Sequence, residues 1–397
     1  MKQIKTITAT EMRGINRTAI LEIIRVEGPT SRSYIAETLK VSLPTVMRIV
    51  DELIEEGFVI ETNEKEWSGG RKRSLIEFNT KDFLTIGVDL GGTKFYGAVA
   101  NLGGEIIFEK QYSKHNTKQE ESYKLVVNLI NELLEQSKST GKKILGIGVG
   151  APGVTYHERG VISWAPSLEW KNFPLKERLE TEFNIPVVVD NDVNMSALGE
   201  MWFGAGKDAQ NIVTIYIGTG IGAGVVIDGA LYRGSHQMAG EIGYLLPGRE
   251  FLKKEYPGFG ALELQAAGTG IAECARRELE ARGRLKENEE ITAEFVFDAH
   301  RRGEIWAAKI IDETVEYLAI ALAAVITFFD PEVIVLGGGV IQSADLLIGP
   351  ITKKLQGKIP VIPPIVASTL GHQAAVLGAM INLLHNVSDF YVVRKLS

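Results

Sequence analysis

The sequence predicts an α/β protein in which a winged helix-turn-helix precedes two α/β lobes. Residues 1–80 run as helix, turn, helix and two short strands. Two glycine-rich stretches, 87–100 and 211–234, each run strand, glycine turn, strand. Apolar strands and amphipathic helices alternate around these stretches, which is the pattern of α/β domains. Together these observations predict a small head followed by two related lobes.

The composition is that of a globular chain with more than one core. Its 397 residues are 45% hydrophobic and 23% charged, which allows two or three domains. A single cysteine, Cys274, excludes an intramolecular disulfide and fits a reducing compartment. The chain starts without a signal-peptide pattern, and its longest apolar run, 317–329, is too short to span a bilayer. We therefore expect a cytoplasmic protein with no membrane partner.

Apolar residues at helical spacing predict the helices of the first domain, for which we expect the bounds 1–80. Three helices are expected, over 15–27, 30–39 and 43–56. Pro44 stands in the first turn of the third helix, where proline is well tolerated. Residues 58–61 and 74–79 then read as two strands around a polar loop. This order is typical of a winged helix-turn-helix.

Two groups of side chains in this domain are candidates for contact with DNA. The exposed start of the third helix is expected to enter a major groove with Ser42, Pro44, Thr45 and Arg48. The loop between the strands is expected to reach phosphates or a minor groove with Arg71, Lys72 and Arg73.

The charge of the first domain does not by itself indicate a DNA-binding protein. Residues 1–80 hold 12 Lys or Arg and 12 Asp or Glu, so the net charge of −7 belongs to the rest of the chain. The alternative is a small helical interaction module with a solvated basic loop. The order of the elements and the placement of the basic residues favour DNA binding, by a dimer on a near-palindromic site.

Beyond residue 80 the expected elements follow one another as strands and helices. Residues 83–112 predict three strands in a meander, and 122–140 predict an amphipathic helix. Buried strands are expected at 143–151 and 185–190, a second meander at 211–234 and a further strand at 333–337. Three glycine clusters follow these strands, at 89–94, 217–224 and 336–339.

The three glycine clusters indicate a nucleotide site when they are taken as an ordered set. Each one alone is a tight turn more often than a ligand loop. Two such turns facing each other across a cleft can hold phosphates through backbone N–H groups that only glycine lets approach closely. The third cluster is then placed to seat an adenosine.

These motifs resemble those of the sugar kinases of the ROK family (repressors, open reading frames and kinases), which have the actin-like ATPase fold. The resemblance covers residues 81–397 through DLGGTK, GAPG, DNDVNMSALGE, IGTGIGAG, AGEIG and LGGG. The winged helix running into GGRKR resembles the repressor branch of that family. The resemblance to this family implies a small lobe over 81–197, completed by a C-terminal helix at 373–397, and a large lobe over 198–372.

The resemblance implies a sugar site in the cleft between the lobes. Asp192 matches the general base that takes the proton of a sugar hydroxyl, and Asn191 matches a sugar-binding position. Glu241 and Glu263 match two carboxylates that hold sugar hydroxyls. The alternative role for Asp192 is a cap for the helix that follows it.

The resemblance also implies a nucleotide site, with ATP and Mg²⁺ as its cofactors if that function is retained. Asp89 matches the position that organises Mg²⁺. The first phosphate turn matches Gly91, Gly92, Thr93 and Lys94. The second phosphate turn matches Gly218, Thr219 and Gly220, and the adenosine position matches Gly337 and Gly338.

The sequence departs from the family pattern where the family commonly holds zinc. Tyr244 replaces the usual histidine, and no cysteine precedes Glu263, so we predict no zinc and no other metal site of protein ligands. We expect this segment to be ordered by the packing of Tyr244, Phe251, Tyr256 and Phe259. Ser167 stands where the family often has a sugar-binding asparagine. Tyr244 and Ser167 therefore join the expected sugar site.

Two functions are compatible with these motifs. The first is a sugar-responsive transcriptional regulator, a repressor of carbohydrate-utilisation genes, which binds operator DNA as a homodimer or homotetramer and a mono- or disaccharide in the cleft. The second is an ATP-dependent sugar kinase, of glucokinase or N-acetylhexosamine kinase type, with a fused DNA-binding head. The winged helix favours the first, and the intact phosphate turns with Asp192 keep the second open.

Overall fold

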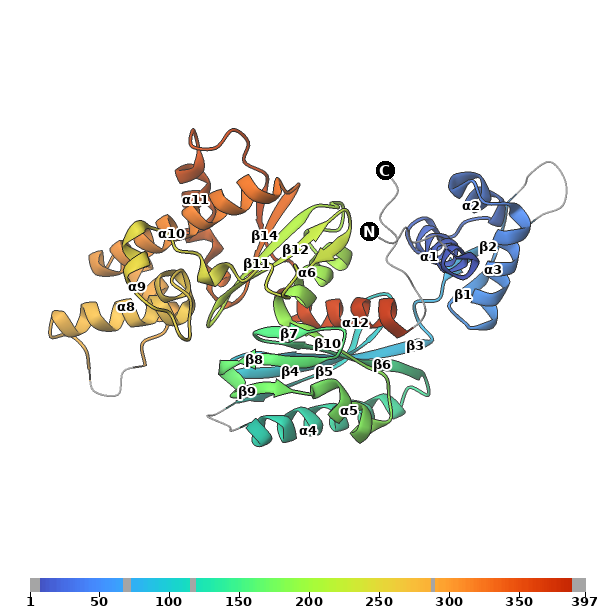
Figure 1. The fold of residues 1–397 in the computed structure, drawn as a ribbon, viewed down its shortest axis with the longest axis horizontal. Coiled ribbons are helices and arrows are strands. Elements are labelled where there is room, and N and C mark those ends of the chain that lie inside the picture. The colour runs from blue at the N-terminus through green and yellow to red at the C-terminus, as the bar shows by residue number, and fades with distance from the viewer. Residues whose placement is uncertain (1–7, 67–72, 115–118, 287–289, 388–397) are drawn as a thin grey trace, which may run out of the picture.

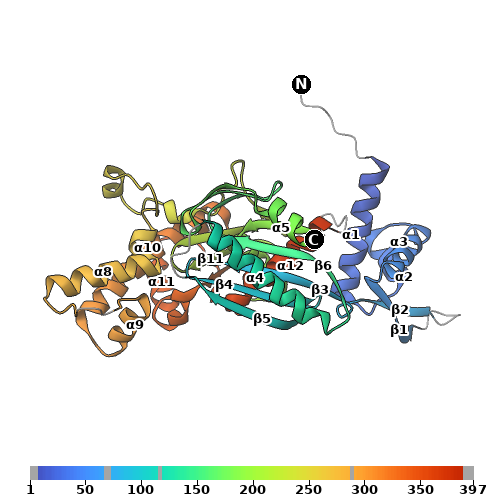
Figure 2. The same ribbon diagram turned by 90° about the horizontal axis from the view of Figure 1, so that it is seen from below.

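The computed structural model describes residues 8–66, 73–114, 119–286 and 290–387. The chain forms three parts, which we name the head, lobe I and lobe II (Figure 1). The head and lobe II lie at opposite ends of the molecule, with lobe I between them (Figure 2). This confirms the predicted order of a winged helix-turn-helix followed by two α/β lobes.

The head is a winged helix-turn-helix. Its elements are α1 (Ala9–Glu27), α2 (Arg32–Leu39), α3 (Leu43–Glu55), β1 (Val59–Glu66) and β2 (Arg73–Phe78). Serine side chains cap two of the helices, because Ser31 Oγ accepts the Tyr34 N–H and Ser42 Oγ accepts the Thr45 N–H. The strands β1 and β2 pair in antiparallel fashion and form the wing.

Lobe I is a five-stranded mixed sheet with helices on both faces. The strand order is β10-β6-β3-β4-β5. These strands are β3 (Phe83–Leu90), β4 (Lys94–Asn101), β5 (Ile106–Ser113), β6 (Lys143–Ala151) and β10 (Val187–Asn191). One face carries α4 (Gln119–Lys138) and α5 (Leu175–Phe183), and the other carries α12 (Ala374–Val387) (Figure 1). A small sheet of β7 (Val154–Tyr156), β8 (Val161–Ala165) and β9 (Trp170–Phe173) extends the lobe.

Lobe II repeats this plan with the strand order β13-β12-β11-β14-β15. Its strands are β11 (Ile212–Ile217), β12 (Ile221–Ile227), β13 (Ala230–Tyr232), β14 (Val333–Gly337) and β15 (Ile365–Ala367). One face packs on α6 (Asp192–Phe203). The core on the other face is closed by α7 (Glu263–Ala266), α8 (Gly268–Ala281), α9 (Ala293–Arg301), α10 (Ile305–Phe329) and α11 (Ile348–Leu355). Among the described residues, no helix has the length and apolarity needed to cross a bilayer.

The two lobes meet where α6 packs against α12. A Cβ added to Gly378 of α12 would overlap the backbone oxygen of Met195, and one added to Gly199 of α6 would overlap that of Ala374. Only glycine lets the two helix backbones come this close. Because α12 packs on β3 and β6 while α6 packs on β11 and β12, this contact is the joint between the lobes.

The predicted division of the second half of the chain can be compared with these elements. The boundary drawn between residues 197 and 198 falls inside α6. The C-terminal helix predicted from residue 373 corresponds to α12, which packs on lobe I, and residues 388–397 lie outside the described residues.

The head shares one hydrophobic cluster with lobe I. This cluster runs from the core of the head through β4 to α12 and includes Ile24, Leu53, Phe58, Phe83, Val376, Met380 and Leu384. The rings of Phe58 and Phe83 stack with their centroids 5.0 Å apart. The head is therefore docked on lobe I by buried apolar surface, beyond its covalent connection into β3.

Replacing Gly378 with alanine tests the joint. Because the new methyl group has no space beside Met195, we expect Gly378→Ala to lower the free energy of unfolding by about 1–3 kcal/mol or more. Chemical denaturation followed by circular dichroism measures this change. Gly349→Ala on α11 is the matched control, because a Cβ there meets open space and alanine favours a helix by about 0.5–1 kcal/mol. Equal effects of the two substitutions would contradict the close contact.

Candidate functional site

The two predicted phosphate turns lie against each other. The first turn follows β3 and the second joins β11 to β12, and a Cβ on Gly92 would lie 2.9 Å from Thr219 Oγ1. Thr219 and its neighbours are fixed by the start of α8, because Thr269 Oγ1 donates to Thr219 O at 2.6 Å and the Gly268 N–H donates to Gly218 O at 2.7 Å. The glycine at position 92 thus permits the close approach of the two turns.

The predicted adenosine glycines lie at the end of β14. Gly337 is buried, and a Cβ there would lie 2.5 Å from the Tyr216 ring. Gly338 has a φ of 91°, which favours glycine. The Tyr216 hydroxyl donates to Gly371 O at 3.2 Å, so the ring beneath Gly337 is held in place by the segment before α12.

Two carboxylates lie at the same edge of the lobe I sheet, at the ends of β3 and β10, which flank β6. Asp89 lies near the end of β3, and Asp192 begins α6 directly after β10. Burial raises the pKa of Asp89 well above its usual value, and the nearby negative charge of Asp192 raises it further. Burial also raises the pKa of Asp192 to about 6, although a hydrogen bond from the Val193 N–H acts against this shift.

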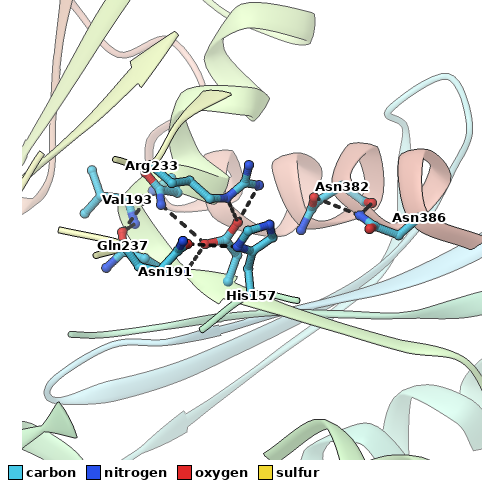
Figure 3. Close-up of polar contacts among 9 residues, drawn as sticks. His157, Asn191, Val193, Arg233, Gln237, Asn382 and Asn386 are labelled. Carbon is cyan, nitrogen blue, oxygen red and sulfur yellow. Dashed lines mark hydrogen bonds and ion pairs between the residues drawn. The ribbon is translucent and has the colours of Figure 1, made fainter. Parts of the chain in front are cut away.

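Asn191 is the cap of α6. Its side-chain oxygen accepts the N–H groups of Val193 and Asn194, each at 3.0 Å (Figure 3). Its amide nitrogen donates to Gly153 O at 3.1 Å. The capping role considered for Asp192 thus falls to Asn191. One N–H of the Asn191 amide and most of the Asp192 carboxylate remain for a ligand.

Glu241 and Glu263 bring two more carboxylates to this place from lobe II. Burial raises the pKa of Glu241 to about 7, with the negative charges of Asp192 and Glu263 acting in the same direction. Glu263 accepts the Ile221 N–H at 2.8 Å and the Gly260 N–H at 2.7 Å. Its carboxylate is therefore held in one orientation beside the second phosphate turn.

The segment that departs from the family pattern is ordered by fewer aromatic residues than expected. The Tyr244 hydroxyl donates to Gly258 O at 2.8 Å, and Phe251 is buried against the Tyr317 ring. The Tyr256 hydroxyl donates to Phe251 O at 3.3 Å. The prediction that Phe259 packs is wrong, since 47% of this residue is exposed. The backbone of Gly260 lies directly against Gly243, with no room for a Cβ, while the preceding Phe259 is exposed.

The other two residues expected in the sugar site, Tyr244 and Ser167, both lie on the surface. Tyr244 is 44% exposed, and Ser167 is exposed in the 3-10 turn Pro166–Leu168. The Ser167 carbonyl oxygen accepts a hydrogen bond from Lys114 Nζ. Over the residues that the structure describes, no three His, Cys, Asp or Glu side chains are grouped so that they could hold a metal ion. The absence of zinc stays a prediction.

A polar contact between the lobes beside this site had no signal in the sequence. Arg233 follows β13 of lobe II, and its Nε and Nη2 donate to Oδ2 of the buried Asp190 at 2.9 and 2.7 Å (Figure 3). The other oxygen of Asp190 accepts the Asn191 N–H at 2.7 Å. Nearby, His157 Nδ1 and Gln237 Oε1 are 2.8 Å apart. These contacts fix the turn that carries Asn191 and Asp192.

The candidate DNA-binding surface is the start of α3. Ser42, Pro44 and Arg48 are exposed, and the half-buried Thr45 shares a hydroxyl hydrogen bond of 2.8 Å with Ser42. Met47, which was not among the predicted contacts, is also exposed there. The opposite face of α3 is buried through Val46, Ile49, Val50 and Leu53. Arg71 and Lys72 lie outside the described residues, as does the side chain of Arg73 at the start of β2.

Comparison with known proteins finds relatives along nearly the whole chain. The sequence profile of the ROK family matches residues 85–386, and a profile for winged helix-turn-helix DNA-binding domains matches residues 15–60. The chain is 33% identical to the xylose repressor of Caldicellulosiruptor bescii over 334 residues, which cover 83% of this chain and 84% of that protein. It is 35% identical to the glucokinase of Halalkalibacterium halodurans over 310 residues, 74% of this chain and 92% of that enzyme.

Solved structures give the same result. A ROK family transcriptional regulator, described as a homologue of the E. coli MLC protein, matches with a TM-score of 0.82 at 27% identity and covers 96% of this chain and 98% of its own. A ROK family glucokinase from Streptomyces griseus, in complex with glucose and AMPPNP, matches with a TM-score of 0.66 at 29% identity over 75% of this chain and 97% of its own. The chain therefore belongs to the ROK family and carries a winged helix-turn-helix DNA-binding domain ahead of its ROK domain.

Proposed function

We propose that the chain is a sugar-responsive transcriptional repressor of carbohydrate-utilisation genes. The observation that carries this function is the docking of the head, through one continuous hydrophobic cluster, on α12 at the joint between the lobes. A head docked there is sensitive to the orientation of the lobes. An enzyme that only phosphorylates sugars has no need of such a head.

The proposed effector is a monosaccharide, and xylose is the first candidate. Xylose repressors from several bacteria share 24–33% identity with this chain and are matched over most of their length. We also propose that the protein binds its operator as a homodimer or homotetramer. It is proposed to act in the cytoplasm, where it has access to the DNA.

In the proposed site, the sugar hydroxyls donate to Asp192, Glu241 and Glu263 and accept from the free amide N–H of Asn191. These groups come from both lobes, so a sugar that contacts all of them favours one orientation of the lobes. A ligand changes the affinity for DNA only if it binds one orientation better than another. Tyr244 and Ser167 are proposed to form the rim of the site and to limit the size of the sugar.

The residues present also fit a nucleotide, because the two glycine turns lie against each other and the space beside Gly218 is open, so a phosphate can approach the backbone closely. Gly91, Gly92, Thr93, Lys94, Gly218, Thr219 and Gly220 would hold the phosphates, Gly337 and Gly338 the adenosine, and Asp89 the Mg²⁺. Bound ATP would supply a phosphoryl group for transfer. Asp192, with a pKa of about 6, would hold the proton of the attacking hydroxyl.

This fit keeps the second candidate function, an ATP-dependent sugar kinase, open to a direct measurement. Release of ADP in the presence of xylose, glucose or N-acetylglucosamine, abolished by Asp192→Asn, would establish it. A protein that binds sugar and DNA but releases no ADP is a regulator alone.

The repressor function predicts that a sugar changes the affinity for an operator. The full-length protein is used to select its operator from random DNA, and binding is measured with and without each sugar of a panel. We expect at least one sugar to lower the operator affinity tenfold or more. Arg48→Ala is expected to weaken operator binding by about tenfold, because one base or phosphate contact contributes about 1–3 kcal/mol, and to leave sugar binding unchanged.

The matched control is Lys138→Ala, which removes an exposed cation from α4 in lobe I. It is expected to change neither affinity. A complete panel without any effect on operator binding would refute the repressor function.

The raised pKa of Glu241 predicts that sugar binding depends on pH. Below about pH 7 this carboxyl keeps a proton, and a sugar hydroxyl donates best to the ionised form, so binding releases a proton. We expect sugar affinity to rise between pH 6 and pH 8, by up to about tenfold per pH unit. Titration calorimetry at several pH values measures this slope.

Glu241→Gln is expected to flatten the slope, and Glu255→Gln, on an exposed residue of the same segment, is expected to keep it. The same shift has a consequence for stability without sugar. The pKa of Glu241 in the folded protein lies above its value in the unfolded chain. The contribution of Glu241 to the free energy of unfolding is therefore fully present below about pH 4.5 and is lost as the pH rises through 7. An affinity independent of pH in the wild-type protein would contradict the assigned role of Glu241.

A further inference from the structure

Three helices from three parts of the molecule meet at one point, which we name the head junction. It consists of Arg25 on α1 of the head, Trp202 near the end of α6, and His385 near the end of α12. The guanidinium carbon of Arg25 lies 3.9 Å from the centroid of the Trp202 ring. The His385 ring meets the Trp202 ring edge-on, with the centroids 5.6 Å apart.

Arg25 is held over the Trp202 ring by a neighbour on its own helix. Its Nε donates to Glu22 Oε2 at 3.0 Å, and its Nη2 donates to Glu22 Oε1 at 2.6 Å. This two-point contact fixes the plane of the guanidinium, and a fixed plane is suited to stacking on an aromatic ring. About a third or less of each of these two side chains is exposed, so the contact is partly shielded from water.

His385 contributes an uncharged ring to the junction. Burial lowers its pKa to about 4, with Arg25 and Arg233 acting in the same direction and Glu22 acting against them. At neutral pH the junction therefore contains one cation, Arg25, facing the Trp202 ring. Cations stack favourably on the face of tryptophan, and the neutral imidazole does not compete for it.

Helix α6 connects this junction to the ligand site. Asp192 is its first residue and Trp202 is its last but one, so the two lie about 15 Å apart along the helix axis. The helix packs on β11 and β12 of lobe II and is locked to the interlobe site by the cap of Asn191. Because a packed helix moves as a rigid body, a displacement of the first turn of α6 would also displace Trp202.

Helix α12 gives the head its other attachment. Val376, Met380 and Leu384 belong to the hydrophobic cluster that the head shares with lobe I. The head is thus anchored on the helix of lobe I. Arg25 contacts the helix that packs on lobe II, and Trp202 and Phe203 of that helix also pack against the shared cluster. A rotation of the lobes about the close contact of Gly199 and Gly378 would shift Trp202 relative to Arg25.

We propose that the Arg25–Trp202 contact transmits the sugar-dependent orientation of the lobes to the DNA-binding head. This inference rests on the proposed repressor function and names the contact through which the sugar site acts. In one orientation of the lobes the Arg25–Trp202 contact holds the head in the position seen in this structure. In the other orientation the contact is broken. The sugar and the operator are then coupled because each favours one of the two arrangements.

The test measures this coupling in the full-length protein. Arg25→Gln removes the cation, Trp202→Leu removes the ring, and Trp202→Phe keeps an aromatic face. The probes are the selected operator and D-xylose, or the sugar of the panel that the wild-type protein binds most tightly. Three quantities are measured for each variant: sugar affinity by calorimetry, operator affinity without sugar, and operator affinity with saturating sugar.

We expect the Arg25→Gln and Trp202→Leu variants to keep their sugar affinity within about threefold of the wild type. Their operator affinity without sugar is expected to stay within the same range. The effect of sugar on operator affinity is expected to fall from tenfold or more to less than about twofold. Trp202→Phe is expected to keep most of the effect. Arg178→Gln is the matched control, because Arg178 stacks on the Tyr123 ring at 3.8 Å and pairs with Glu120, within lobe I. It is expected to keep the full effect.

The outcomes separate this inference from the function on which it rests. Variants at Arg25 and Trp202 that respond to sugar as the wild type does would overturn the inference alone. Variants that lose operator binding without sugar would also overturn it, because the contact would then only anchor the head. A wild-type protein whose operator affinity no sugar changes would overturn the repressor function itself, before any variant is made.

Discussion

The contact between α6 and α12 is the constraint on which the rest of this structure depends. Gly199 and Gly378 let the two helix backbones touch, and any larger side chain at Gly378 would overlap the Met195 carbonyl oxygen. Each helix packs on the sheet of a different lobe, so the contact sets how the lobes lie relative to each other. The proposed ligand site is at one end of α6, and the head is at the other.

The electrostatics of the candidate site fit the polyhydroxylated ligand that we propose for it. Burial raises the pKa values of Asp89, Asp192 and Glu241, and the negative charges of neighbouring carboxylates raise those of Asp89 and Glu241 further. In the proposed site, sugar hydroxyls that donate to Asp192 and Glu241 would offset the cost of burying these two carboxylates without adding charge. The paired Asp190 and Arg233 beneath them keep the turn in place, since a buried carboxylate is tolerated when a cation and N–H groups satisfy it.

The same two lobes are found in enzymes and regulators of the ROK family, so the fold alone does not decide between the two functions. The differences between this chain and the family pattern lie at the edge of the candidate site and outside it. Tyr244 and Ser167 are the proposed rim of the site, and the head adds a second surface joined to α12. A cleft that retains its carboxylates while gaining such a head is a natural arrangement for sensing a sugar.

The sequence by itself determined the parts of this protein that depend on local pattern. The helices of the head, the apolar strands and the glycine turns all follow from residue spacing, and DLGGTK with GTGIGAG indicated both the family and the cleft. Residue spacing also placed Ser42 at the start of α3.

Only the tertiary structure decided the contacts between residues far apart in the chain. Arg233 pairs with Asp190 across 43 positions, and Arg25 reaches Trp202 from another domain. No periodicity marks such partners, because they depend on how finished elements pack. The same reason applies to Asn191, which caps α6 in place of Asp192, and to Phe259, which is exposed although its sequence position predicted packing. Local spacing forms the elements, and burial between them selects the partners.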